Sequence, residues 1–94
     1  MLKIDVTQAD IDMASRFRSR SDKFWPSNAY CPIACALKRT LTVNYAWVSI
    51  DYATCKGNRY WLPPAATTFI STWDDFCEVK PFSFEAKKIE MVSA

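Results

Sequence analysis

The sequence predicts a small α+β domain, with a mostly antiparallel sheet and about three short helices on one face. Half of the 94 residues are apolar and only one is Gly, a composition typical of a packed globular chain. Stretches that alternate apolar and polar residues are separated by stretches whose apolar residues have helical spacing. Pro-Pro and Lys-Gly-Asn sequences mark boundaries between these stretches. A chain of this length suits one domain, which we expect to span residues 1–94.

The first third of the chain predicts a strand, a helix and a loop. Residues 2–6 alternate briefly and predict an edge strand. Thr7 and Asp10 have the spacing of a capping box, so a helix is expected to begin there and to fade by residues 19–21. Residues 18–30 then predict a basic loop, and a loop of that length in a compact domain is usually functional or mobile.

The middle third predicts a second helix and a hairpin. Pro32 suits the first position of a helix, which we expect to run to about Arg39. Residues 41–52 are rich in β-forming types. Their large apolar residues lie at odd-numbered positions before Val48 and at even-numbered positions from Val48 onward. Such a parity change indicates a bulge or a strand buried on both faces. Residues 55–59 hold the only glycine and predict a hairpin turn.

The last third predicts a helix, a strand and a tail. Pro63 and Pro64 end the preceding strand and begin the helix, which should stop near Phe76 because acidic residues are unfavourable at a helix C-terminus. Its expected core face has helical spacing: Ala66, Phe69, Ile70, Trp73 and Cys77. Residues 79–85 predict a closing strand, with Phe82 and Phe84 on one face.

Residues 86–94 are expected to form a mobile tail, or to extend the closing strand through Ile89 and Met91. Large aromatic side chains usually dominate a core. We therefore expect the four tryptophans to supply much of it: Trp25, Trp47, Trp61 and Trp73.

The residue types present exclude several kinds of chemistry. The chain has no His, which excludes His-based acid–base catalysis, Ser-His-Asp and Cys-His nucleophiles, and zinc sites that contain His. One glycine cannot build a Gly-rich phosphate loop. We therefore expect a protein that is not an enzyme and that holds no cofactor.

Four cysteines leave more than one interpretation open: Cys31, Cys35, Cys55 and Cys77. A Cys₄ zinc site is possible in principle, but Cys55 and Cys77 stand alone rather than in a C-x₂-C knuckle. Cys31 could be an activated thiol at a helix start beside basic residues, or simply an N-cap. Buried core thiols are the favoured interpretation, with no metal bound.

The N-terminus has no apolar run of signal-peptide length, and no stretch approaches the length of a membrane span. We therefore expect a cytoplasmic protein without membrane contact, in which the cysteines stay reduced.

Positive charge is concentrated in residues 16–40, which hold six basic residues and one Asp. This basic segment could contact a partner, because Arg and aromatic residues often dominate protein interfaces. The candidate partner-binding residues are Arg16, Arg18, Arg20, Lys23, Phe24, Trp25 and Tyr30. The alternative is phosphate binding at the helix start of Cys31, with Arg18, Arg20, Lys38 and Arg39. A plain solubilising surface, with its aromatic rings packed inward, is a third interpretation.

Three motifs carry a resemblance that extends over the whole chain. They are Val6-Thr-Gln-Ala-Asp-Ile11, Cys31-Pro-Ile-Ala-Cys-Ala-Leu37 and Val79-Lys-Pro-Phe-Ser-Phe84. The chain resembles a set of small bacteriophage proteins of uncharacterised activity, which share V-T-Q-x-D-I, C-P-[IV]-A-x-A-L and V-x-P-F-x-F motifs. Residues 15–30 are longer here than in that set. The resemblance implies a phage protein acting in the bacterial cytoplasm, and it transfers no activity or site.

The expected function is that of a phage-encoded accessory protein which binds and inhibits or modulates a host factor, such as a defence complex, by direct protein contact. Small phage proteins commonly act in this way, so the expectation is an analogy. The alternative is a binder of nucleic acid or nucleotides that uses the basic segment.

Overall fold

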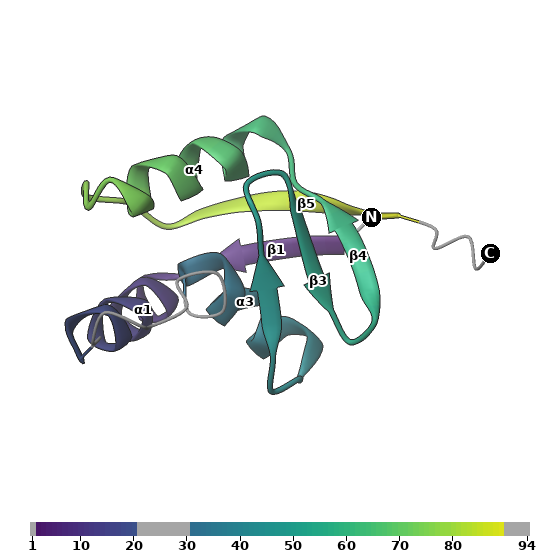
Figure 1. The fold of residues 1–94 in the computed structure, drawn as a ribbon, viewed down its shortest axis with the longest axis horizontal. Coiled ribbons are helices and arrows are strands. Elements are labelled where there is room, and N and C mark those ends of the chain that lie inside the picture. Colours follow the sequence, from purple (N-terminus) through teal and green to yellow (C-terminus); the bar gives the residue numbers. More distant parts are fainter. Residues whose placement is uncertain (1, 21–30, 90–94) are drawn as a thin grey trace.

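The computed structural model describes residues 2–20 and 31–89. It contains three helices and five strands in these ranges (Figure 1). In chain order they are β1 (Leu2–Val6), α1 (Gln8–Arg20), α3 (Pro32–Leu41), β2 (Ala46–Val48), β3 (Tyr52–Cys55), β4 (Asn58–Trp61), α4 (Pro64–Asp74) and β5 (Phe82–Ile89). The predicted α+β class is confirmed.

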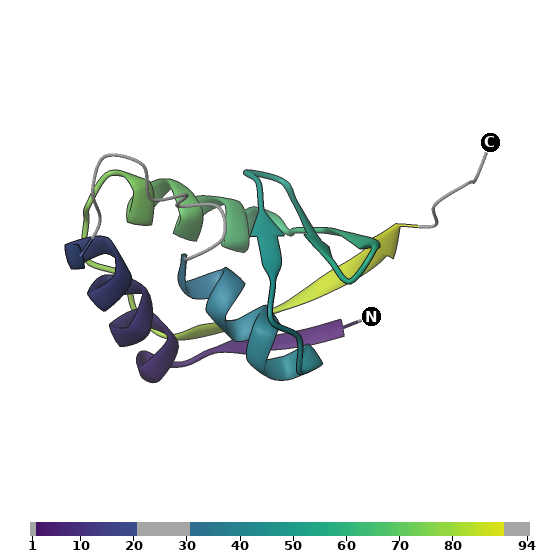
Figure 2. The same cartoon turned by 60° about the horizontal axis from the view of Figure 1, so that its bottom comes forward.

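The strands form one sheet in the order β1-β5-β4-β3-β2, and every neighbouring pair is antiparallel. Helix α3 contacts both β1 and β2, which are the two end strands of the sheet. The sheet therefore curls around α3, which lies on its inner side (Figure 2). Helix α1 packs in turn against α3.

The core lies between the inner face of the sheet and the helices. Ile4 of β1 pairs with Phe84 of β5, and both are buried. Phe82 shares their face, as predicted, and its ring lies 4.6 Å from the ring of Phe69 in α4 and 5.4 Å from that of Phe84. Stacked rings of this kind bury a large apolar area, which fixes α4 on the sheet.

Helix α3 is the most deeply buried helix among the described residues. All residues from Pro32 to Leu37 are buried. Cys31 is its N-cap, and the Cys31 sulfur accepts a hydrogen bond from the amide of Ala34 at 3.4 Å. Thr42 ends the helix in the left-handed conformation, with a φ of 53°.

Residues 41–52 do not form the single strand that the sequence predicts. Leu41 still belongs to α3, and a hairpin of β2 and β3 follows. The amide of Ser49 donates to the carbonyl of Tyr52 at 2.8 Å, which closes a turn over residues 50–51. The parity change thus marks a turn between two short strands, and the predicted bulge is wrong.

The hairpin turn predicted at residues 55–59 is confirmed between β3 and β4. Lys56 and Gly57 have φ values of 54° and 79°. Two successive positive φ values are typical of the tight turns that match the twist of antiparallel strands.

Helix α4 ends at Asp74, slightly before the predicted end at Phe76. The amides of Phe76 and Cys77 donate to the carbonyls of Trp73 and Thr72, which closes the helix end. Cys77 lies beyond this closure and is exposed. Its predicted place on the core face of the helix is therefore wrong.

Two predicted boundaries also change. Helix α1 continues through Arg20, so residues 18–20 are helical rather than the start of a loop. Strand β5 runs to Ile89 and Ala86 is fully buried, so the predicted tail does not begin at residue 86 and the strand extension through Ile89 is confirmed. Residues 21–30 and Met91 lie outside the described ranges.

Candidate binding face

Much of the predicted partner-binding segment lies outside the described residues. Arg16 is exposed on α1, and its Nε donates to the carbonyl of Asp12 at 3.5 Å. Arg18 and Arg20 belong to α1, but their side chains are not described. Lys23, Phe24, Trp25 and Tyr30 fall within residues 21–30, outside the described part of the chain.

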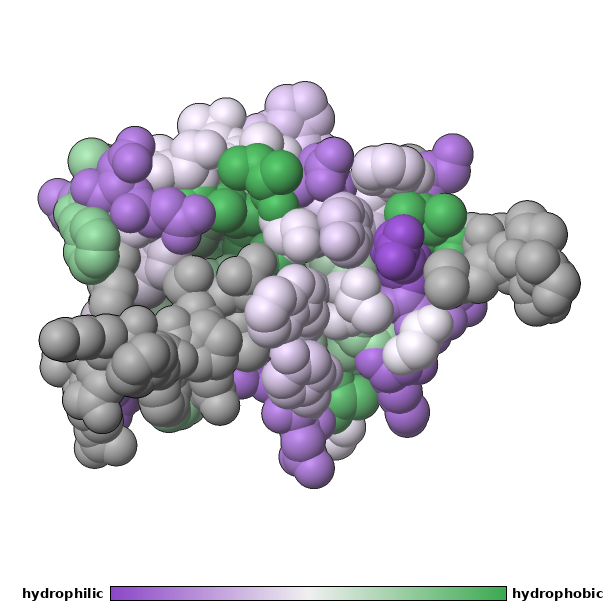
Figure 3. All heavy atoms as spheres, in the orientation of Figure 1, coloured by the Kyte–Doolittle hydropathy of each residue, from purple (hydrophilic) through white to green (hydrophobic). Residues whose placement is uncertain are grey.

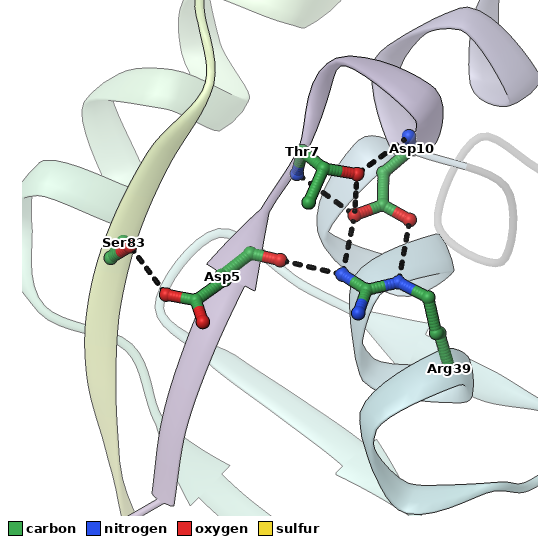
Figure 4. A network of polar contacts seen from close by, with 5 residues as sticks. All are labelled: Asp5, Thr7, Asp10, Arg39 and Ser83. Atoms are coloured by element: carbon green, nitrogen blue, oxygen red, sulfur yellow. Dashed lines mark hydrogen bonds and ion pairs between the residues drawn. The ribbon is translucent and has the colours of Figure 1, made fainter.

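Arg39, a residue of the alternative phosphate set, holds two elements together (Figure 4). Its Nη2 lies 2.9 Å from Oδ2 of Asp10, and its Nε donates to the other carboxylate oxygen at 3.3 Å. The same Nη2 donates to the carbonyl of Asp5 at 2.8 Å. Asp10 is buried, so this guanidinium already neutralises an internal carboxylate.

The helix start at Cys31 is closed to solvent. Cys31 is only 4% exposed, and Ile33 and Ala34 are fully buried. Burial raises the pKa of the Cys31 thiol to about 12. This effect of burial is larger than the opposite effect of the hydrogen bonds from the amides of Ala34 and Ile33, which lower the pKa. An activated thiol or an anion at this helix start would need an open, polar site. The N-cap interpretation therefore fits the position, and the activated-thiol interpretation does not.

The other cysteines come from separate parts of the fold. Cys35 lies on α3 and Cys55 on β3, both buried, whereas Cys77 is exposed after α4. Burial also raises the pKa of the Cys35 and Cys55 thiols. Within residues 2–20 and 31–89, no group of three or more His, Cys, Asp or Glu side chains is arranged to hold a metal ion.

A different set of side chains gathers on the outer side of the sheet. Successive residues of a strand point to opposite faces, and the buried residues Ala46, Ala53 and Tyr60 mark the inner face. Several outward positions of β2–β5, and Tyr45 just before β2, carry aromatic or basic side chains, whereas Thr54 on β3 and the outward residues Ser83, Glu85 and Ile89 on β5 do not. We call this set the aromatic face: Tyr45, Trp47, Tyr52, Thr54, Arg59, Trp61 and Lys87.

The aromatic face is open to solvent. Tyr45 is 58% exposed, Trp61 50% and Trp47 36%, while Tyr52 is half-buried. Figure 3 views the molecule from the side on which β2 and β3 lie in front of α3, and residues of intermediate hydropathy, drawn pale, gather over these strands.

The rings and cations of this face lie in two neighbouring rows across the sheet. Tyr52 pairs with Trp61 across β3 and β4, and Trp61 pairs with Lys87 on β5. In the neighbouring row, Trp47 pairs with Thr54 and Thr54 with Arg59. Each row therefore combines at least one aromatic residue with one basic residue, and together the rows span four adjacent strands.

Two contacts hold these side chains in place. The Arg59 guanidinium lies over the Tyr52 ring, 4.9 Å from its centroid. The Tyr45 and Trp47 rings stack with their centroids 6.5 Å apart. The face thus presents exposed rings beside a fixed cation.

The sequence does not predict this face, because large aromatic residues such as tryptophan are expected in the core. Trp73 does lie in the core, but Trp47 and Trp61 do not, and Trp25 lies outside the described residues. The inner face opposite α3 carries small residues instead, such as Ala46 and Ala53, because the helix approaches closely. One available signal was the Tyr-Ala-Thr-Cys alternation of residues 52–55, in which the small residues could have been recognised as the buried ones.

A search against family models found no match, and comparisons with the curated proteins and with the solved structures found none either. Within residues 2–20 and 31–89, no helix has the length and apolar character needed to cross a membrane.

Proposed function

We propose that this protein is a non-enzymatic binder of nucleic acid or nucleotides, and that the aromatic face is its contact surface. The observation that carries the proposal is the grouping of exposed rings with Arg59 and Lys87 on adjacent strands. Rings stack on bases and cations neutralise phosphates, so a surface that combines them suits a ligand built from both.

The charge of the aromatic face supports an anionic ligand. Its outward positions on β2, β3 and β4 carry no Asp or Glu, whereas Arg59 lies at its centre and Lys56 in the adjoining turn. On β5 the outward residues include Glu85 as well as Lys87. The aliphatic residues beside the face are Ile50, in the turn after β2, and Ile89, which pairs with Arg59. A stacking ligand requires flat rings and cations rather than an aliphatic centre.

The proposal is tested by fluorescence anisotropy with labelled DNA and RNA at low salt. The wild-type protein should bind, and the double variant Trp47→Ala/Trp61→Ala should bind at least about fivefold more weakly, since each stacked base contributes about 1–3 kcal/mol. Met13→Ala is the matched control, because Met13 is 48% exposed on α1, away from the sheet. Equal binding by the double variant and the wild type would contradict the proposal.

The second candidate is the function expected from the resemblance to phage proteins: an accessory protein that binds a host protein, such as a defence factor, in the bacterial cytoplasm. The observation that favours it is again the aromatic face, because Trp, Tyr and Arg are the residues that most often dominate protein interfaces. Its test is capture of host proteins from nuclease-treated lysate with the wild type and with Trp47→Ala/Trp61→Ala. A stoichiometric host protein retained by the wild type and lost by the variant would support it.

A further inference from the structure

We infer that the ligand of the aromatic face is an unpaired single strand of nucleic acid, rather than a duplex or a free nucleotide. The inference rests on the proposed function and names the form of ligand that the face fits.

First, the aromatic face contains the combination of a ring and a neighbouring cation twice. Trp61 has Lys87 as its cross-strand neighbour, and Tyr52 has the Arg59 guanidinium over its ring. Tyr52 and Trp61 lie directly opposite each other on β3 and β4, so the two rings arise from positions about 5 Å apart. A nucleotide contains one base and one phosphate. Two ring-and-cation units side by side therefore suit consecutive nucleotides of a chain.

The second argument excludes a duplex. In a duplex the base faces stack on one another, so a protein reaches only base edges and phosphates. Rings exposed on the sheet, such as Trp61, then have no base face to stack on.

The third argument excludes a free nucleotide. Tyr45, Trp47 and Trp61 lie on an open surface, where a single base would contact one ring and stay exposed on its other side. Small ligands usually bind in concave sites that bury most of their surface. A cavity of about 400 Å³ lies away from this face, between Ile11 of α1 and Trp73 of α4.

Charge also argues against a second copy of this chain on the face. Two copies placed face to face would enclose the cations Arg59, Lys87 and Lys56 of both copies in one interface. Like charges brought together across an interface cost several kcal/mol, whereas an anionic strand is complementary to all three.

The experiment measures binding of fluorescein-labelled oligothymidylates from two to about eight nucleotides long, at about 50 mM salt. Three further probes have the length of the longest oligothymidylate: an oligouridylate, an abasic phosphodiester and a duplex. Thymidine monophosphate is a fourth. Affinity should rise with length and then level off. The abasic chain and the duplex should bind at least about fivefold more weakly than the thymidylate of equal length, because they offer no free base faces. Equal affinity for oligothymidylate and oligouridylate would show that the face does not distinguish DNA from RNA and would support recognition by stacking.

The cations are tested by salt titration of the same complex. Arg59→Gln and Lys87→Gln should each reduce the slope of log affinity against log salt by about 0.7, the contribution of one phosphate contact to a single strand. Lys80→Gln is the control, because Lys80 is exposed but precedes β5 and lies away from the aromatic face.

The outcomes distinguish a failure of the proposed function from a failure of the inference that the ligand is a single strand. If no probe binds at low salt, the proposed function itself fails. If the duplex, the abasic chain or thymidine monophosphate binds as tightly as the longest oligothymidylate, the aromatic face binds phosphate without stacking a single strand, and the present inference is overturned.

Discussion

The Arg39 guanidinium reaches from the last turn of α3 to the Asp10 carboxylate in the first turn of α1, with its Nη2 2.9 Å from Oδ2. Asp10 also completes the capping box that the sequence predicts. The amide of Thr7 donates to Asp10 Oδ2 at 2.9 Å, and the amide of Asp10 donates to Thr7 Oγ1 at 3.2 Å. One buried carboxylate therefore caps one helix and joins it to another.

Replacement of Asp10 should lower stability. Asp10→Ala removes the hydrogen bonds to Thr7 and to Arg39, and we expect a loss of about 2 kcal/mol in the free energy of unfolding. Arg39 is half exposed, so water can solvate its charge in the variant. Asp12→Ala is the control, since Asp12 is exposed on the same helix and should change stability by less than about 0.5 kcal/mol. Urea denaturation measures both, and equal losses would contradict this role of Asp10.

The same carboxylate predicts a dependence of stability on pH. Burial alone would raise the pKa of Asp10, but the hydrogen bonds from Arg39 and Thr7 outweigh it, so its pKa is lowered in the folded protein. A group with a lowered pKa stabilises the fold above its unfolded pKa of about 4, and this stabilisation is lost as the pH falls further.

The measurement compares the wild type with Asp10→Asn, whose side chain does not titrate. The difference in their unfolding free energies should be constant from about pH 7 to about pH 5 and should shrink below about pH 4. A difference that persists undiminished in acid would mean that the Asp10 charge is unimportant.

The thiols should differ sharply in reactivity. Cys77 is exposed, whereas burial raises the pKa of the Cys31 thiol to about 12 and also raises that of Cys35 and Cys55. Because the thiolate is the reactive form, one thiol per chain should react rapidly with a thiol reagent in the native protein. Cys77→Ser should abolish this fast phase and leave the slow reactions unchanged. A fast phase that survives in Cys77→Ser would show that a second thiol is accessible.

Local signals in the sequence predict most of the fold. Pro32 and Pro64 begin their helices as expected, Thr7 and Asp10 form the cap, and Gly57 lies in its hairpin turn. Each depends on residues close together in the chain, where backbone sterics and capping decide the outcome.

Long-range packing explains what the sequence did not reveal. The β2–β3 hairpin and the exposure of Trp47 and Trp61 depend on α3, which packs on the inner side of the curled sheet against β1 and β2 and lies opposite small residues such as Ala46. No local pattern encodes that close approach, so large aromatic residues were assigned to the core by type alone. The aromatic face became visible only when the register placed its residues on neighbouring strands.

The end of α3 offers a stabilising substitution. Thr42 is exposed and has φ and ψ of 53°, a left-handed conformation that is unfavourable for a β-branched residue and free of cost for glycine. Thr42→Gly should therefore raise the free energy of unfolding by about 0.5–1 kcal/mol, measured by urea denaturation. Thr68→Gly is the control, because Thr68 is exposed within α4, where glycine should lower stability instead.

The tryptophans allow a direct comparison of core and face. Trp73 is 4% exposed, so Trp73→Ala should lower the free energy of unfolding by about 3–5 kcal/mol. Trp61 is 50% exposed on the aromatic face, and Trp61→Ala should cost about 1 kcal/mol or less while it weakens ligand binding. Thermal or urea denaturation of both variants measures the contrast. If Trp61→Ala were as destabilising as Trp73→Ala, its ring would be a structural element of the sheet, and loss of binding in that variant could not be assigned to stacking.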